Sequence, residues 1–359
     1  MNLRATHKLA VLGLFVIALF ATRQIRAQYL TLEGQTGGFL TPTAYVVESA
    51  KGQFLSHPAV GVHFINAKAV IGDFETLSLT EGFANRAEAG YTRSVHQFGN
   101  SGPSSASASV IPGGLSQLWN ASGMNIFHGK VIGIKDGQFG LWTPGLAIGG
   151  VVRTGDKFVT GEAAILATEA TDAYCQYTGG LAFGLCTLIP VPTAKTYTNG
   201  DIYIAVTKTW DRKPVPFLAN FGWKATNGTI FGIGGQSTRF GGRLFGGLGI
   251  PLPLGHGIVA VPSAGFTQEP GTSKGLGTAS LTSLPLVAGK ADLPTTMDYA
   301  VRITQRAHPH FAFDIGIGQV AGNIGAAPTY TFPNPAPTGA APIDLQARKV
   351  VGMGLSYRY

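Results

Sequence analysis

Six charged residues interrupt segments that otherwise alternate bulky apolar residues with small ones. They are Glu88, Lys224, Asp298, Arg302, Asp314 and Arg358. If these segments are extended strands, the charges fall on the face opposite the bulky set, because successive side chains point to opposite sides. Such charges could pair with one another, with Asp314 beside Arg302 or Arg358. Alternatively, they could line a water-filled passage and select the ions that cross it.

The sequence contains no familiar catalytic arrangement. It lacks HExxH and a Walker-type glycine loop, and Ser263 in "VPSAG" lacks the first glycine of a nucleophile elbow. His63 and His128 fall inside expected strands, where a hydrogen bond within the fold is the simpler role. We therefore expect no catalytic residue, cofactor or metal site, and we expect that the protein is not an enzyme.

The two cysteines, Cys175 and Cys186, bracket the stretch "QYTGGLAFGL". In an exported protein, a close pair of this kind usually forms a disulfide that closes a loop. No histidine or second cysteine pair lies nearby at the spacing of metal ligands. We expect a disulfide between Cys175 and Cys186.

The first residues have the layout of a secretory signal peptide. Arg4 and Lys8 precede the apolar run "LAVLGLFVIALFA", and polar residues follow at once. The run is shorter than the roughly 20 apolar residues that a membrane-spanning helix needs. We expect a signal peptide over residues 1–27, cleaved after Ala27.

The composition is unusual for a water-soluble domain. The chain has 51 Gly and only 12% charged residues, whereas roughly a quarter of a typical soluble domain is charged. The formal net charge is +8, with 26 Lys and Arg against 18 Asp and Glu. Four of the basic residues lie in the leader, and the small excess that remains gives no reason to expect a nucleic-acid partner. Much of the surface is expected to face something other than water.

Many segments of roughly 10 residues alternate in the same way, and this is the length that a tilted strand needs to cross a bilayer. In "HFAFDIGIG", for example, Phe311, Phe313 and Ile315 share one face, while Asp314 and Gly316 lie on the other. The expected strands cover residues 57–66, 70–79, 84–95, 124–135, 139–153, 201–210, 216–226, 242–251, 256–267, 297–306, 310–318 and 350–359. About twelve strands fit the even numbers of bacterial outer-membrane barrels.

The connections between these strands alternate in length. Counting back from the last strand, long connections such as 321–346, 268–295 and 154–200 alternate with short ones such as "AHPH" and "DRKPV". Outer-membrane barrels have short periplasmic turns and long outer loops. A soluble β-sandwich is the alternative, but its outer face would carry many charges. We therefore expect an all-β, antiparallel, up-and-down transmembrane barrel over residues 57–359.

The last residues, "GLSYRY", resemble the C-terminal recognition signal of bacterial outer-membrane β-barrel proteins. The resemblance covers the last ten residues and involves Leu355, Tyr357 and Tyr359. It implies assembly by the barrel-assembly machinery, a location in the bacterial outer membrane and contact with its lipid.

The stretch "GQTGGFLTPTAYV", residues 34–46, is similar to the opening of YjbH-like outer-membrane proteins linked with exopolysaccharide secretion, with an extra Gly at Gly38. We expect residues 28–56 to lie at the periplasmic mouth or to plug the lumen. The expected function is passage of a small solute through a porin-like channel. The alternative is a non-conducting barrel for envelope structure or polysaccharide export.

Overall fold

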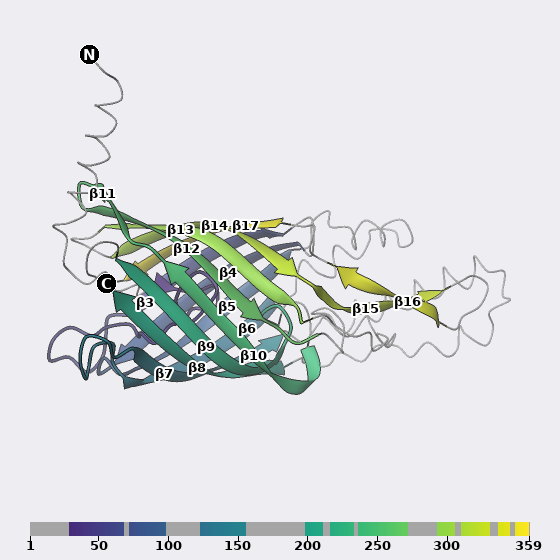
Figure 1. Cartoon of the computed structure of the whole chain (residues 1–359), viewed down its shortest axis with the longest axis horizontal. Helices are drawn as coiled ribbons and strands as arrows, with labels where there is room; N and C mark the ends of the chain where they lie inside the picture. Colours follow the sequence, from purple (N-terminus) through teal and green to yellow (C-terminus); the bar gives the residue numbers. More distant parts are fainter. Residues whose placement is uncertain are drawn as a thin grey trace, which may run out of the picture.

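The computed structural model describes residues 29–67, 72–97, 123–155, 198–210, 216–232, 236–271, 293–305, 310–330, 337–344 and 349–358. Within these ranges no helix is long and apolar enough to span a membrane. The fold is all-β, as the alternation of the sequence predicts, and its main body is a closed antiparallel barrel of 12 strands (Figure 1).

The barrel strands follow one another around the wall in chain order. They are β3 (Ala59–Ala67), β4 (Gly72–Phe83), β5 (Ala87–Gln97), β6 (Gly123–Ile134), β7 (Gly145–Gly155), β8 (Thr198–Trp210), β9 (Phe217–Gly228), β10 (Gln236–Gly249), β12 (Ile258–Gln268), β13 (Thr295–Gln305), β14 (Phe311–Ala321) and β17 (Lys349–Arg358). The first and last strands close the wall, since β17 pairs with β3 from Val351↔Asn66 to Arg358↔Ala59. Closure leaves no unpaired sheet edge, which is the arrangement that strands need in a bilayer.

Five further strands lie outside the barrel wall proper. The short β11 (Leu252–Gly255) extends the end of β12, and β15 (Asn323–Tyr330) pairs with β16 (Pro337–Asp344) in a hairpin beyond the barrel. Figure 1 shows this hairpin at the end opposite the C-terminus. We call these two ends of the barrel the loop end and the terminal end. The remaining pair, β1 (Tyr29–Leu30) and β2 (Thr36–Gly37), forms a minimal hairpin.

Several of the expected strand boundaries are wrong, and three differ by four residues or more. The strand expected from residue 242 already begins at Gln236. The strand expected at 139–153 begins at Gly145, because residues 135–144 form consecutive turns in which Gly137 and Gly140 have positive φ. The turn expected near residues 80–83 instead follows Phe83, where Ala84 and Asn85 take left-handed conformations. The β15–β16 hairpin lies in a connection that the sequence analysis treated as a plain loop.

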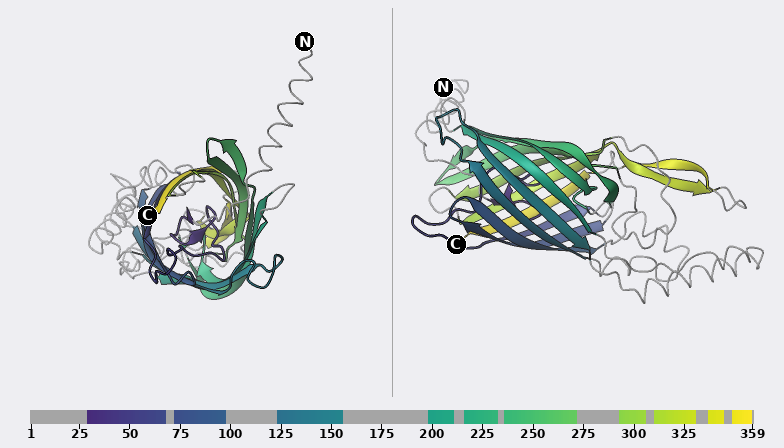
Figure 2. Two further views of the ribbon diagram at one scale, coloured as in Figure 1. Left: turned by 90° about the vertical axis from the view of Figure 1, so that its left-hand side faces the viewer. Right: turned by 90° about the horizontal axis from the view of Figure 1, so that it is seen from below.

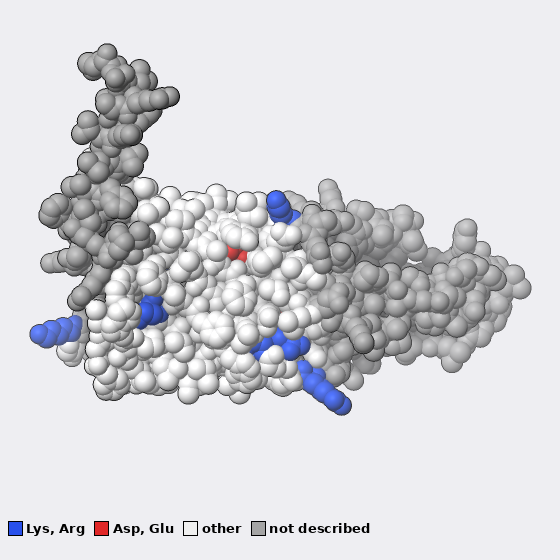
Figure 3. All heavy atoms as spheres, in the orientation of Figure 1, with Lys and Arg blue, Asp and Glu red and all other residues white. Residues whose placement is uncertain are grey.

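Alternation along each strand sorts the side chains between the two faces of the wall. On β3 every second residue is buried and the residues between are exposed or half-buried, and β14 follows the same pattern except at half-buried Gly318. The exposed set is apolar and includes Leu77, Phe127, Ile202 and Ile315. Figure 3 shows one side of the barrel, where charged atoms are few across the described wall. The buried set faces inward and includes most of the polar and charged residues.

Candidate functional site

The lumen holds the start of the described chain. Residues 29–47, here called the plug, lie inside the ring of strands (Figure 2, left). The plug is buried along its length: Leu30, Thr36, Ala44 and Val47 are each at most 1% exposed. The barrel core is therefore formed between the plug and the inward side chains of the wall.

Glu88 on β5 binds the plug backbone. Its carboxylate accepts hydrogen bonds from the backbone N–H of Thr36 (2.9 Å) and of Val47 (3.1 Å), and from the Thr36 hydroxyl. Lys130 on β6 lies 3.0 Å from the same carboxylate and donates to the Thr36 carbonyl at 2.9 Å. Both charged side chains are fully buried. This pair fixes the middle of the plug to the wall.

A second buried cluster joins the plug to the loop end of the wall. Arg153, at the end of β7, forms an ion pair with Glu33 of the plug and donates to Asp201 on β8 at 2.6 Å. A second N–H of its guanidinium reaches Glu33 at 2.9 Å, and a third reaches Asn199 at 3.2 Å. Arg153 is 0% exposed. Two carboxylates surrounding one guanidinium leave the cluster with a net charge of −1.

Neutral contacts hold the rest of the plug. Thr207 accepts from the backbone N–H of Ala44 at 2.7 Å, and the Asn220 amide donates to the Pro42 carbonyl at 2.9 Å. The Thr80 hydroxyl donates to the Gly34 carbonyl at 2.6 Å. Near the loop end, the apolar plug residues Leu32, Phe39 and Leu40 pack in a cluster with Ile65, Phe74, Ile230, Phe231 and Val320.

Two glycines are needed for this close fit. Gly34 has φ +84°, a conformation that residues with a side chain rarely adopt. A Cβ atom on Gly82 of β4 would collide with the Val47 carbonyl. The plug backbone thus lies directly on the wall backbone at Gly82.

The structure places all six sequence-predicted charged residues on the inner side of the wall. Arg302 forms two hydrogen bonds with Asp314, at 2.6 and 3.0 Å, and a third with the Gly37 carbonyl of the plug at 2.9 Å. Arg358 donates to the Glu48 carbonyl at 3.4 Å. Most of these charges therefore bind protein groups.

Lys224 on β9 pairs with Glu269, 2.9 Å away, just beyond the end of β12. Burial raises the pKa of Glu269 to about 7, although Lys224 acts in the opposite direction. The other oxygen of this carboxylate, Oε2, has no hydrogen-bond partner within the described ranges. Both oxygens of Glu88 have partners, whereas only one oxygen of Glu269 has a partner among the described residues.

Sequence reasoning missed five charged members of these clusters: Lys130, Arg153, Glu33, Asp201 and Glu269. Lys130 shares a face with His128 on an expected strand, and that parity could have identified it. Glu33 lies before the expected barrel, so no strand pattern assigns it a position. Its partner Arg153 ends an expected strand, where the direction of a side chain is least certain.

The remaining predicted residues lie elsewhere. Cys175 and Cys186 lie outside the described residues, so their disulfide stays a prediction. Leu355 is half-exposed on the outer face of β17, and the ring of Tyr357 lies 4.5 Å from that of Phe311. Tyr359 is also outside the described residues. Within the described ranges, no group of three or more His, Cys, Asp or Glu could hold a metal ion.

The closed 12-strand wall and inward polar residues define an outer-membrane-type β-barrel. No family model and no curated protein matches the sequence. Solved structures with a similar fold include the KdgM porin (8% identity, TM-score 0.40, covering 84% of this chain and 99% of that one). The NanC porin (8%, TM-score 0.39, 84% and 100%) and LpxR from Salmonella typhimurium (8%, TM-score 0.43, 84% and 100%) are also similar. Likeness at this identity concerns the fold alone, and the fold suggests an outer-membrane location.

The expectation that the protein is not an enzyme, which rested on the absence of catalytic motifs, is contradicted by the structural comparison. LpxR is an enzyme, and it belongs to the barrels that resemble this chain. A barrel of this kind therefore does not exclude catalysis.

Proposed function

We propose that the protein is a porin-like channel of the bacterial outer membrane that is closed by its own N-terminal segment, and that a small solute crosses when the plug moves. The observation that carries this proposal is the position of residues 29–47 inside the lumen, bound by buried groups such as Glu88 and Arg153. In barrels of about 8 strands, inward side chains alone fill the lumen. A barrel of 12 strands is wider. Here a chain segment supplies the remaining filling.

The outer surface supports the membrane location. The apolar outward residues form the kind of surface that lipid covers, and aromatic rings such as Trp142, Trp210 and Phe217 contact one another at the terminal end. Aromatic residues commonly mark the membrane boundary of such barrels. Lipid and, through Leu355, Tyr357 and Tyr359, the barrel-assembly machinery are the partners that we propose.

A non-conducting barrel is the second candidate, and the same filled lumen favours it. The stretch that resembles YjbH-like proteins, residues 34–46, lies wholly within the plug. On this alternative the plug is a permanent core, and the protein serves envelope structure or polysaccharide export without passing solute.

A reversible tether between plug and wall separates the two candidates. A Cβ atom on Gly61 of β3 would lie 3.3 Å from the Cβ of Leu30, close to the roughly 3.5–4.5 Å of bonded cysteines. The variant Leu30→Cys/Gly61→Cys, with Cys175 and Cys186 replaced by Ser, joins the N-terminal end of the plug to the wall. The C-terminal end of the plug already continues along the chain into β3.

Planar-bilayer recordings of this variant are expected to show openings under reducing conditions and none after oxidation. Each single-cysteine variant serves as a control and should be insensitive to oxidation. Openings that persist in the oxidised double variant would contradict a moving plug. A reduced protein that never opens at any voltage would favour the non-conducting barrel.

A further inference from the structure

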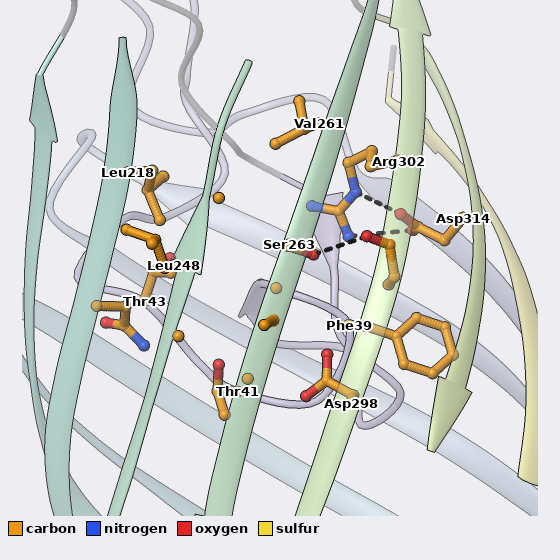
Figure 4. Close-up of a pocket in the computed structure, with 17 residues that line it drawn as sticks. Phe39, Thr41, Thr43, Leu218, Leu248, Val261, Ser263, Asp298, Arg302 and Asp314 are labelled. Atoms are coloured by element: carbon orange, nitrogen blue, oxygen red, sulfur yellow. Dashed lines mark hydrogen bonds and ion pairs between the residues drawn. The ribbon is translucent and has the colours of Figure 1, made fainter. Parts of the chain in front are cut away.

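The plug leaves a cavity of about 60 Å³ against one part of the wall (Figure 4). Phe39, Thr41 and Thr43 line it from the plug, and residues of β9, β10, β12, β13 and β14 line it from the wall. Gly247, Leu248 and Gly249 line the cavity from β10, and the two glycines offer only backbone there. The cavity is the space that remains between the plug and the inner face of the wall.

Asp298 of β13 lines this cavity, as Figure 4 shows. The residue is only 4% exposed, and its Oδ1 has no hydrogen-bond partner in the part of the chain that the structure describes. A buried carboxylate oxygen without a partner is costly, because it has lost its water and gained no hydrogen bond in exchange. Asp298 is therefore a group whose partner has still to be identified.

The neighbouring charges do not supply that partner. Arg302 also lines the cavity, but it is engaged by both oxygens of Asp314 and by the Gly37 carbonyl. The Arg302–Asp314 pair is neutral as a unit, so Asp298 leaves the cavity with one net negative charge. The hydroxyl of Ser263 donates to the Ala300 carbonyl at 3.3 Å, which leaves its oxygen lone pairs free to face a cation.

We propose that this cavity binds a small monovalent cation, with the Asp298 carboxylate as its charged ligand and the Thr41 and Ser263 hydroxyls as neutral ones. One negative charge matches one positive charge, whereas a divalent ion would leave an excess. The volume holds about four water-sized spheres at roughly 15 Å³ each. An alkali or ammonium ion with a few waters fits, and a sugar does not. If the bound cation is also the solute that crosses the barrel, the site names the class of that solute. Only this identification rests on the proposed function.

Thallium(I) is a suitable probe because it resembles potassium and scatters anomalously. Crystals of the mature protein soaked in a thallium salt are expected to show an anomalous peak beside the Asp298 carboxylate. The peak should vanish in Asp298→Asn and remain in Asp73→Asn, a matched change on the inner face of β4, which does not line the cavity. Absence of the peak in the native protein, or its survival in Asp298→Asn with the plug in place, would overturn the proposal.

Thermal unfolding in detergent gives a second measurement that does not depend on crystals. The unfolding temperature of the native protein should be higher in KCl or NH4Cl than in choline chloride at equal ionic strength, because choline is too large for the cavity. Asp298→Asn should show no such difference. Equal unfolding temperatures of the native protein in all three salts would count against the site. Neither readout involves conductance, so the cation site and the gated channel can fail separately.

Discussion

The plug meets two parts of the barrel wall in different ways. Against β4–β8, here called the packed side, it is held by Glu88, Lys130 and Arg153. Against β9, β10, β12 and β13, here called the glycine side, it leaves the cavity beside Gly247 and Asp298. Both sides carry inward glycines, but on the packed side Gly82 touches the plug backbone and Gly90 lies against His128. At Gly82 glycine therefore permits close contact with the plug, whereas Gly247 and Gly249 lie beside space that the plug leaves open.

This difference indicates how the lumen could serve two roles. The packed side determines whether the plug stays in place, because its contacts are buried and charged. The glycine side provides the room that a small solute needs. Changes on the packed side should therefore have large effects, and matched changes on the glycine side small ones.

Arg153→Met should have the largest effect. It leaves the Glu33 and Asp201 carboxylates buried without their partner, which costs about 3–5 kcal/mol. Hydrogen exchange at the plug amides should accelerate strongly. Lys208→Met is the control, because the Lys208–Asp136 pair is partly exposed, at 20% and 15%, and such pairs contribute about 0–1 kcal/mol. Equal exchange in the two variants would contradict the claim that the buried Arg153 cluster holds the plug in place.

Acidity should act through Glu269, which lies beyond β12 on the glycine side. Its pKa of about 7 in the folded protein exceeds the ordinary 4.5, because burial disfavours the charged carboxylate. The folded state therefore holds this proton more tightly, so the stabilisation is complete below pH 4.5 and is lost as pH rises towards 7. The difference is on the order of 3 kcal/mol at about 1.4 kcal/mol per pH unit.

Urea unfolding at pH 4.5 and 7.5 measures this effect, and Glu269→Gln should flatten the part of the pH dependence that belongs to this residue. A Gln variant with the same pH profile as the native protein would show that another group is responsible.

A methyl group added to each side tests the fit of the plug directly. Gly82→Ala pushes a Cβ into the Val47 carbonyl, and overpacking of this kind costs about 1–3 kcal/mol. In Gly247→Ala the new Cβ lies 3.1 Å from the Ala264 carbonyl, 3.5 Å from the Gly265 Cα and 3.7 Å from the Thr41 hydroxyl, so it does not press on the plug backbone. We expect a lower unfolding temperature for the first variant and little change for the second. The reverse order would be incompatible with the described packing.

Removal of one hydroxyl on each side tests the same contrast through single hydrogen bonds. Thr207 is 0% exposed. Its hydroxyl accepts from the Ala44 N–H and donates to the Asn220 amide oxygen, so Thr207→Val should cost about 1–3 kcal/mol. Ser263 is half-buried and makes one hydrogen bond to the Ala300 carbonyl, so Ser263→Ala should cost about 0.5–1.5 kcal/mol. Chemical unfolding of the two variants gives the comparison.

The barrel could be predicted from sequence because the alternation of bulky and small residues is local and repeats. Asp314 and Arg302 share the inner face by parity alone, and the structure pairs them across neighbouring strands. The boundary errors at Gly145 and Phe83 arose where turn residues continue the alternation. Those errors shift only the end of a strand. They do not change which residues face the lumen and which face outward.

The interior of the lumen could not be predicted in the same way. Glu33 reaches Arg153 across 120 positions of sequence, and no local pattern links an N-terminal turn to the end of a distant strand. Parity shows that Asp298 faces inward, but only the packed structure shows that Arg302 is already occupied. The sequence allowed a plug in residues 28–56 without showing what it would contact.

Conductance of a plug deletion tests the central claim most directly. The mature protein and a variant lacking residues 29–47 should be inserted into the same planar bilayer at low voltage. The account predicts that the mature protein stays closed for most of the recording, while the deletion variant conducts continuously as an open barrel. Equal conductance of the two proteins would contradict a lumen closed by this segment.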